Sequence, residues 1–233
     1  MSFRNSVTIV ASPRARVGKT LLARLATEFN AQEGRAVAAF DLGGGTLAQF
    51  LPEYTSQSSI SDIRGQMALF DRLVAEDGAA KVVDLGHEAF EGFFALAEKI
   101  GFAEEAMRRA IIPAVLYVMT PDATSVEAYR ALHRRFPQIV LAPVHNEIFG
   151  PAHHRDKYRL AGSDTAVMRL PMLGAPVRGF IETPPFAISR PSGLSPAVRG
   201  ELNDWMRQAF LGFREFDLRL LLADLQSAIR IGS

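Results

Sequence analysis

The sequence predicts an α/β fold with a mainly parallel sheet and helices on both faces. Three observations carry this prediction. The strand candidates are short, continuous apolar runs, which is typical of strands buried on both faces. Each run is joined to the next by a segment whose apolar residues recur at helical spacing. With 233 residues, 48% of them hydrophobic, the chain is large enough to bury one substantial core, so we expect a single domain over 1–233.

The expected elements alternate in type along the chain. Strand candidates are the runs 7–11, 36–41, 80–84, 114–119 and 139–144. Helical periodicity follows them over about 17–33, 61–77, 89–109 and 122–136, and 51–59 is expected to be loop. Prolines predict an irregular surface excursion over about 151–194, and apolar spacing predicts a C-terminal helical region over about 195–230.

A candidate phosphate-binding loop follows the first strand. Residues 13–20 read Pro-Arg-Ala-Arg-Val-Gly-Lys-Thr, where the standard loop reads G-x-x-x-x-G-K-[ST]. Pro13 replaces the first glycine and removes one backbone N–H. The preceding strand and the following helix N-terminus supply the context that phosphate binding needs. The sequence therefore predicts a P-loop NTPase domain whose phosphate contacts are Ala15, Arg16, Val17, Gly18, Lys19, Thr20 and Leu21.

Polar residues close the predicted strands at the edge where parallel sheets bind ligands. These residues are Asp41, Asp84, Thr120 and Asn146. Because Mg²⁺ takes few protein ligands and keeps several waters, we expect Thr20 to ligate it directly and Asp84 to hold a coordinated water. A helix-cap or turn role is the alternative for Asp84.

With these motifs in this order, the chain resembles the MinD/ParA class of P-loop ATPases, a branch of the SIMIBI class, over roughly 7–171. The loop of that class reads K-G-G-x-G-K-[ST], which places Arg14 on the signature lysine and Ala15 and Arg16 on two glycines. The resemblance implies that ATP and Mg²⁺ lie between two subunits of a homodimer. It implies further that Arg14, or else Arg16, reaches the partner's phosphates, and that Asn146 and Pro171 belong to the nucleotide site, Asn146 at the adenine.

The second strand departs from the pattern of that class. The class has D-x-D, and its second Asp positions the attacking water, whereas here the residues are Asp41-Leu42-Gly43. Asp41 stays a catalytic candidate beside Lys19 and Arg14. Loss of a group that orients the nucleophile commonly costs ~10²–10⁴-fold in rate. Whether ATP is hydrolysed is therefore left open by the sequence.

Three functions are open at this point. The leading hypothesis is an ATP-binding, nucleotide-dependent dimerising switch with slow or impaired hydrolysis, at most a weak Mg-dependent ATPase. The second is a degenerate scaffold protein that holds nucleotide, or has lost it, without turnover. The third is a small-molecule phosphotransferase or ligase that resembles the dethiobiotin-synthetase branch, for which the sequence identifies no acceptor pocket.

Charge and composition limit the partners. A net charge of +1 makes no case for a dedicated nucleic-acid binder, although local arginines leave DNA contact open. Acidic residues interleave with arginines in the C-terminal helical region, so stable membrane binding is not expected, and packing on the domain or on an unidentified partner protein is preferred. The absence of cysteine and the short N-terminal apolar run predict a cytoplasmic protein.

Overall fold

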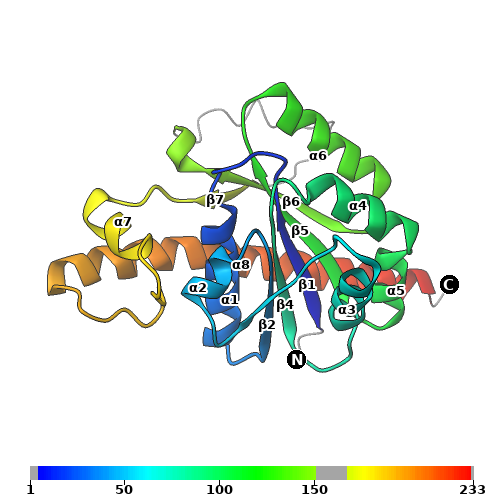
Figure 1. Cartoon of the computed structure of the whole chain (residues 1–233), viewed down its shortest axis with the longest axis horizontal. Coiled ribbons are helices and arrows are strands. Elements are labelled where there is room, and N and C mark those ends of the chain that lie inside the picture. The colour runs from blue at the N-terminus through cyan, green and yellow to red at the C-terminus, as the bar shows by residue number, and fades with distance from the viewer. Residues whose placement is uncertain (1–4, 151–166, 232–233) are drawn as a thin grey trace.

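The structure, a computed structural model, describes residues 5–150 and 167–231. Within them a seven-stranded sheet has the order β3-β2-β4-β1-β5-β6-β7, and all of its pairings are parallel (Figure 1). The strands are β1 Ser6–Ala11, β2 Val37–Leu42, β3 Thr55–Gln57, β4 Ala80–Leu85, β5 Ile112–Met119, β6 Val140–Asn146 and β7 Met168–Leu170. The predicted α/β class with a parallel sheet is confirmed.

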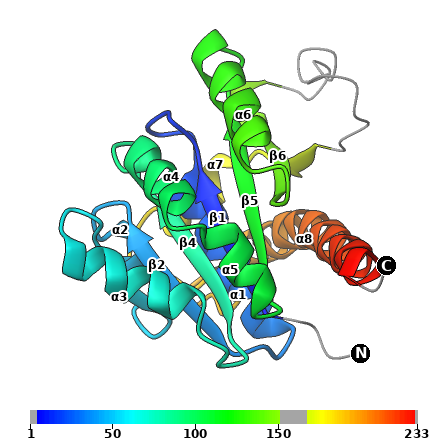
Figure 2. The ribbon, with the colours of Figure 1, turned by 90° about the vertical axis from the view of Figure 1, so that its right-hand side faces the viewer.

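Helices cover both faces of the sheet, as predicted. They are α1 Lys19–Gln32, α2 Thr46–Phe50, α3 Ile63–Leu73, α4 Phe90–Lys99, α5 Phe102–Arg108, α6 Ala123–Arg135, α7 Ala175–Ile181 and α8 Pro196–Ile231, with a 3-10 turn η1 at Glu147–Phe149. One apolar core joins the sheet to α1, α2, α7 and α8, and a second core joins it to α3, α4, α5 and α6. Figure 2 shows these two layers on opposite sides of the strands.

The central strands are continuous apolar runs because both of their faces are covered. All six residues of β4 are buried, and β1 is buried from Val7 to Ala11. Parallel register pairs Val10 of β1 with Asp84 of β4, and Asp84 with Asp41 of β2. The two aspartates therefore lie side by side at the level where β1 ends.

Helix ends differ in detail from the prediction. Asp62, and not Ser61, caps α3 by accepting a hydrogen bond from the Gly65 N–H at 2.8 Å. The single helix expected over 89–109 is two helices, since Gly101 adopts a left-handed conformation with φ of 64° between α4 and α5.

Two short strands were missed by the sequence analysis. β3 lies within the predicted loop 51–59, and β7 lies within the predicted proline-rich excursion, which also contains α7. Residues 151–166 of that excursion lie outside the described residues. Among residues 5–150 and 167–231, no helix is both long enough and apolar enough to span a bilayer.

Buried polar residues of α1 hold the irregular chain after α7. The Arg24 guanidinium donates to the carbonyls of Ile181 and Phe186 at 2.7 and 2.8 Å. One turn later, the Glu28 carboxylate accepts the N–H of Ile188 at 3.0 Å. Irregular backbone can pack against the core here because these side chains satisfy its polar groups.

The long helix α8 is part of the core on one of its faces. Phe213 stacks on Phe29 of α1 with ring centroids 5.4 Å apart, and Phe210 meets the same ring edge-on at 5.3 Å. Asp217 pairs with Arg35 beyond the end of α1. The helix therefore packs against the C-terminal part of α1 and the chain just beyond it.

We expect Phe213→Ala to lower the free energy of unfolding by about 3–5 kcal/mol, because it leaves a cavity under a buried ring. Phe180→Ala is the matched control, since Phe180 on α7 is exposed, and its loss is expected to be below about 1 kcal/mol. Urea unfolding of both variants measures the difference. Equal losses would contradict the packing of α8 against α1.

Candidate functional site

The candidate site is built around the loop between β1 and α1. Gly18 is the N-cap residue of α1 and has φ of 94°, no side chain caps the helix, and its first turn carries no acid. Among the described residues, the backbone N–H groups of residues 16–21 find no hydrogen-bond acceptor. These N–H groups and the helix dipole make the loop a site for an anion.

Arg16 occupies a conformation that suits glycine. Its φ of 58° lies in the left-handed region, at a position where the MinD/ParA loop has glycine. A side chain there costs roughly 1–2 kcal/mol. The Arg16 side chain is exposed, so the strained residue places its guanidinium in solvent beside the loop.

The Lys19 amino group lies inside the curve of the loop. It donates to the Arg14 carbonyl at 2.5 Å, and the side chain is buried. Burial lowers the pKa of Lys19, while the Asp84 carboxylate opposes that shift. The ammonium therefore stands between the loop backbone and the acidic end of β4.

Arg14 is bound within its own chain by Asp122. Its Nε and Nη2 donate to Asp122 Oδ1 at 3.0 and 2.5 Å. Asp122 also caps α6 through the Ser125 N–H and accepts the Thr120 hydroxyl at 2.5 Å. The Arg14 hydrogen bonds hold the pKa of the Asp122 carboxyl well below its usual range. From the sequence, Asp122 was expected only to begin a helix, and the Thr120-Pro121-Asp122 segment after β5 is the local signal that marks it as a candidate.

Asp84 and Thr20 lie beside each other at the end of β4. Burial raises the pKa of Asp84 to about 6, and a hydrogen bond from Thr20 lowers it in part. Asp84 Oδ2 is buried without a hydrogen-bond partner among the described residues. A hydroxyl beside an unsatisfied carboxylate oxygen fits the few protein ligands that Mg²⁺ takes. The described residues contain no cluster of three or more metal-ligating acids, histidines or cysteines.

Asp41 anchors the glycine-rich turn after β2. Its Oδ1 accepts the N–H groups of Gly43 and Gly45 at 2.8 and 3.2 Å, and Oδ2 accepts that of Ala48 at 3.1 Å. A Cβ at Gly43 would lie 3.4 Å from Asp84 Oδ2. Gly43 therefore adjoins the two aspartates but adds no side chain beside them. Both carboxylate oxygens of Asp41 thus already accept backbone hydrogen bonds, and its catalytic role stays a prediction.

Asn146 lies against the phosphate loop. Its Nδ2 donates to the Val17 carbonyl at 3.0 Å, and its Oδ1 accepts the Ile148 N–H at 3.1 Å. A Cβ at Gly18 would lie 2.6 Å from that Nδ2, so glycine is required there by contact as well as by φ. The buried carboxamide thus positions the loop, and the adenine contact implied by the resemblance stays a prediction.

Pro171 follows β7 close to the same edge of the sheet. Its carbonyl accepts the indole N–H of Trp205 on α8 at 2.9 Å. Exposed apolar side chains stand next to both predicted residues: Ile148 and Phe149 after Asn146, and Met172 after Pro171. Glu147 joins the two segments by accepting the Met172 N–H at 3.3 Å.

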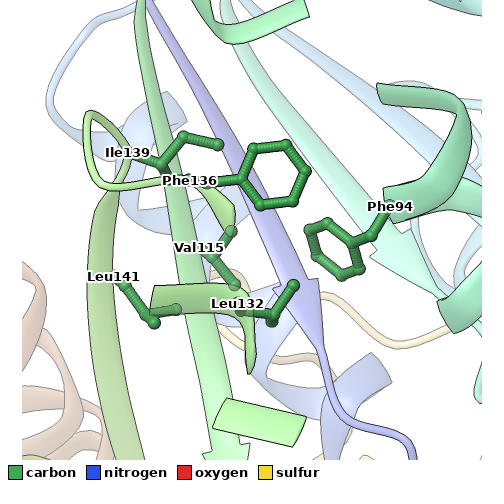
Figure 3. A pocket seen from close by; sticks show the side chains of 6 residues that line it. All are labelled: Phe94, Val115, Leu132, Phe136, Ile139 and Leu141. Carbon is green, nitrogen blue, oxygen red and sulfur yellow. The ribbon is translucent and has the colours of Figure 1, made fainter. Parts of the chain in front are cut away.

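A cavity elsewhere in the domain is not a ligand site. It lies under α4 and α6, and its lining is wholly apolar: Phe94, Val115, Leu132, Phe136, Ile139 and Leu141 (Figure 3). Its volume is about 10 Å³, the size of one water at most. This cavity therefore offers no polar group to a ligand.

No protein-family model and no curated protein sequence matches the chain. Solved structures with a similar chain course include the MinC:MinD cell division protein complex of Aquifex aeolicus, with a TM-score of 0.42, 16% identity and coverage of 60% of this chain and 68% of that one. Chloroplast FtsY of Physcomitrella patens has a TM-score of 0.43 and 15% identity, with coverage of 65% of this chain and 52% of that one. A putative plasmid partition protein of Borrelia burgdorferi B31 bound to AMPPNP has a TM-score of 0.46 and 10% identity, with coverage of 89% of this chain and 98% of that one. These values do not establish a family, and the site rests on its own geometry.

The raised pKa of Asp84 makes folding stability depend on pH. Because the folded protein holds this proton more tightly than the unfolded chain does, stability falls as the pH rises from 3.8 through about 6. We expect Asp84→Asn to remove that loss and to be more stable than the wild type near pH 7.5 by up to ~3 kcal/mol, with no difference below about pH 4.

Urea unfolding across this pH range measures the effect. Asp71→Asn, at an exposed position on α3, is the control for the substitution itself. Destabilisation by Asp84→Asn at neutral pH would contradict an unsatisfied buried carboxylate.

Proposed function

We propose that this protein binds ATP with Mg²⁺ in the β1–α1 loop and acts as a nucleotide-dependent dimerising switch whose hydrolysis is slow or absent. The observation that carries the proposal is the uncapped N-terminus of α1, which presents unpaired N–H groups beside Lys19 and Thr20. Such a terminus favours an anion such as phosphate.

Charge around the loop suits a triphosphate with a divalent cation. Lys19, Arg14 and Arg16 supply positive charge on the loop, and Asp84 supplies an acceptor at the end of β4. Thr20 and Asp84 would hold Mg²⁺, which neutralises phosphate charge when bound. Lys19 would exchange its hydrogen bond with the Arg14 carbonyl for a phosphate oxygen, as a charge-assisted and stronger bond.

The adenine base of ATP would bind to an apolar surface at the same edge of the sheet. Ile148, Phe149 and Met172 are exposed apolar side chains beside the loop-binding Asn146. A purine ring would cover this apolar surface and thereby remove it from water. Polar contacts to the ring would come from backbone groups of the segments after β6 and β7.

Gly43 supports binding without rapid turnover. A Cβ at Gly43 would lie 3.4 Å from Asp84 Oδ2 and 3.5 Å from Asp41 Oδ1, so this position adjoins both aspartates but supplies no carboxylate to orient a water. Absence of such a group commonly reduces the rate by ~10²–10⁴-fold. The same observation favours the second candidate function, a scaffold that holds nucleotide without any turnover.

Arg16 is the better candidate for contact with a second subunit. Arg14 is engaged by Asp122, whereas Arg16 is exposed and has no hydrogen bond or ion pair within the described residues. A strained residue at the mouth of a binding loop is consistent with a functional role. Two copies facing each other across their loops would each offer this guanidinium to the other's phosphates.

We expect Lys19→Ala to weaken ATP binding in the presence of Mg²⁺ by roughly 100-fold, because a charged hydrogen-bond donor to phosphate is lost. Lys99→Ala, at the exposed end of α4, is the control and should bind as the wild type does. Titration of labelled ATP, followed on the same sample by light scattering and phosphate release, separates the candidates. Equal binding by wild type and Lys19→Ala would exclude the loop as the site. Tight binding with neither an increase in mass nor release of phosphate would support the scaffold function in place of the switch.

We expect substitutions of the two loop arginines to have different effects. Arg16→Gly should raise stability by about 1 kcal/mol, because it relieves the left-handed strain, and should reduce the ATP-dependent increase in mass. Arg14→Ala should leave that increase in place, since Arg14 is paired within its own chain. Loss of dimerisation in Arg14→Ala alone would reverse the assignment.

A further inference from the structure

From Leu211 onwards, α8 carries apolar side chains on the face opposite to the one that packs into the core. Leu211, Leu218, Leu222 and Leu225 are 52%, 61%, 59% and 60% exposed. The opposite face of the same helix packs into the core through buried residues that include Phe213, Phe216 and Leu220. A helix that is apolar on two opposite faces has a second surface to cover.

This outer face is spaced for pairing with another helix. Leu211, Leu218 and Leu225 recur every seven residues, the spacing that keeps a seam on one side of a helix in a coiled coil. The spacing is also symmetric about Leu218. An antiparallel copy related by a two-fold axis near Leu218 would therefore place Leu218 against itself and Leu211 against Leu225.

The charges beside the leucines are self-complementary in the same arrangement. Glu215 and Arg219 lie one turn apart on one flank of the row, and neither forms an ion pair within the described residues. Their neighbours Arg207 and Arg214 already pair with Asp204 and Glu33. In the antiparallel pairing, Glu215 of each copy lies near Arg219 of the other.

We propose that the outer face of α8, defined by Leu211, Leu218, Leu222 and Leu225, binds the same face of a second copy of this chain in antiparallel orientation. The face lies away from the phosphate loop: α8 runs the length of the molecule beside the sheet, and the loop lies at the carboxyl edge of the strands (Figures 1 and 2). This contact requires no nucleotide and does not rest on the proposed function.

Single cysteines test the pairing directly, because the chain has none. Leu218→Cys is expected to form a disulfide-linked dimer with diamide as oxidant, without nucleotide and in a Lys19→Ala background. A mixture of Leu211→Cys and Leu225→Cys should link the two variants to each other faster than either links to itself. Met67→Cys, 62% exposed on α3 at the other side of the sheet, is the control of matched exposure and should link slowly.

Light scattering over a concentration series gives an independent measure. The Lys19→Ala protein should approach twice the monomer mass, and Leu218→Glu in the same background should stay monomeric with an unchanged circular dichroism spectrum. A monomer at all concentrations, or linking of Leu218→Cys no faster than Met67→Cys, would overturn the proposal, and so would a monomer that sediments with anionic lipid vesicles. Preferential 211–211 and 225–225 linking would overturn the antiparallel arrangement.

Discussion

The parallel pairing of β1 with β4 on one side and with β5 on the other fixes where the polar groups of the site lie. Because parallel strands end at a common edge, the loop after β1, Asp84 on β4 and Asp122 after β5 arrive at one place. The strands can be parallel only because helices bury both faces of the sheet. Packing of α8 against α1 therefore supports the site, although α8 contributes none of the charged groups around the loop.

Interactions that hold the loop differ in how easily a ligand could replace them. The bond from Asn146 to the Val17 carbonyl is buried, and breaking it would leave two polar groups unsatisfied. Arg14 and Asp122 are both partly exposed, and exposed ion pairs contribute little to stability. The Lys19 ammonium donates to a neutral carbonyl, and a charged phosphate oxygen would accept a stronger hydrogen bond. The loop backbone is thus held in place, whereas a ligand could replace the present hydrogen-bond partners of the Lys19 and Arg14 side chains.

The sequence was sufficient where a local pattern decides the structure. Continuous apolar runs revealed the five longer strands, and the Gly18-Lys19-Thr20 start of α1 is local as well. β3 was missed because Thr55–Gln57 is polar and too short for any periodicity. The bonds from Arg14 to Asp122 and from Asn146 to Val17 join residues 108 and 129 positions apart, so only the tertiary structure brings them together. A residue type at a strand end indicates a site, but its hydrogen-bond partners decide its role.

Two proposed contacts on one subunit have a consequence for assembly. Facing phosphate loops would relate two copies by one two-fold axis, and the outer face of α8 would relate two copies by another. Each such interface alone closes a dimer, whereas two different two-fold interfaces used together join more than two copies, as a closed oligomer where the axes intersect and as an open chain where they do not. Only the loop interface would depend on ATP, and Gly43 supplies no carboxylate for rapid hydrolysis. Nucleotide would then decide whether α8-linked dimers join into a larger assembly, and slow turnover would prolong that assembly.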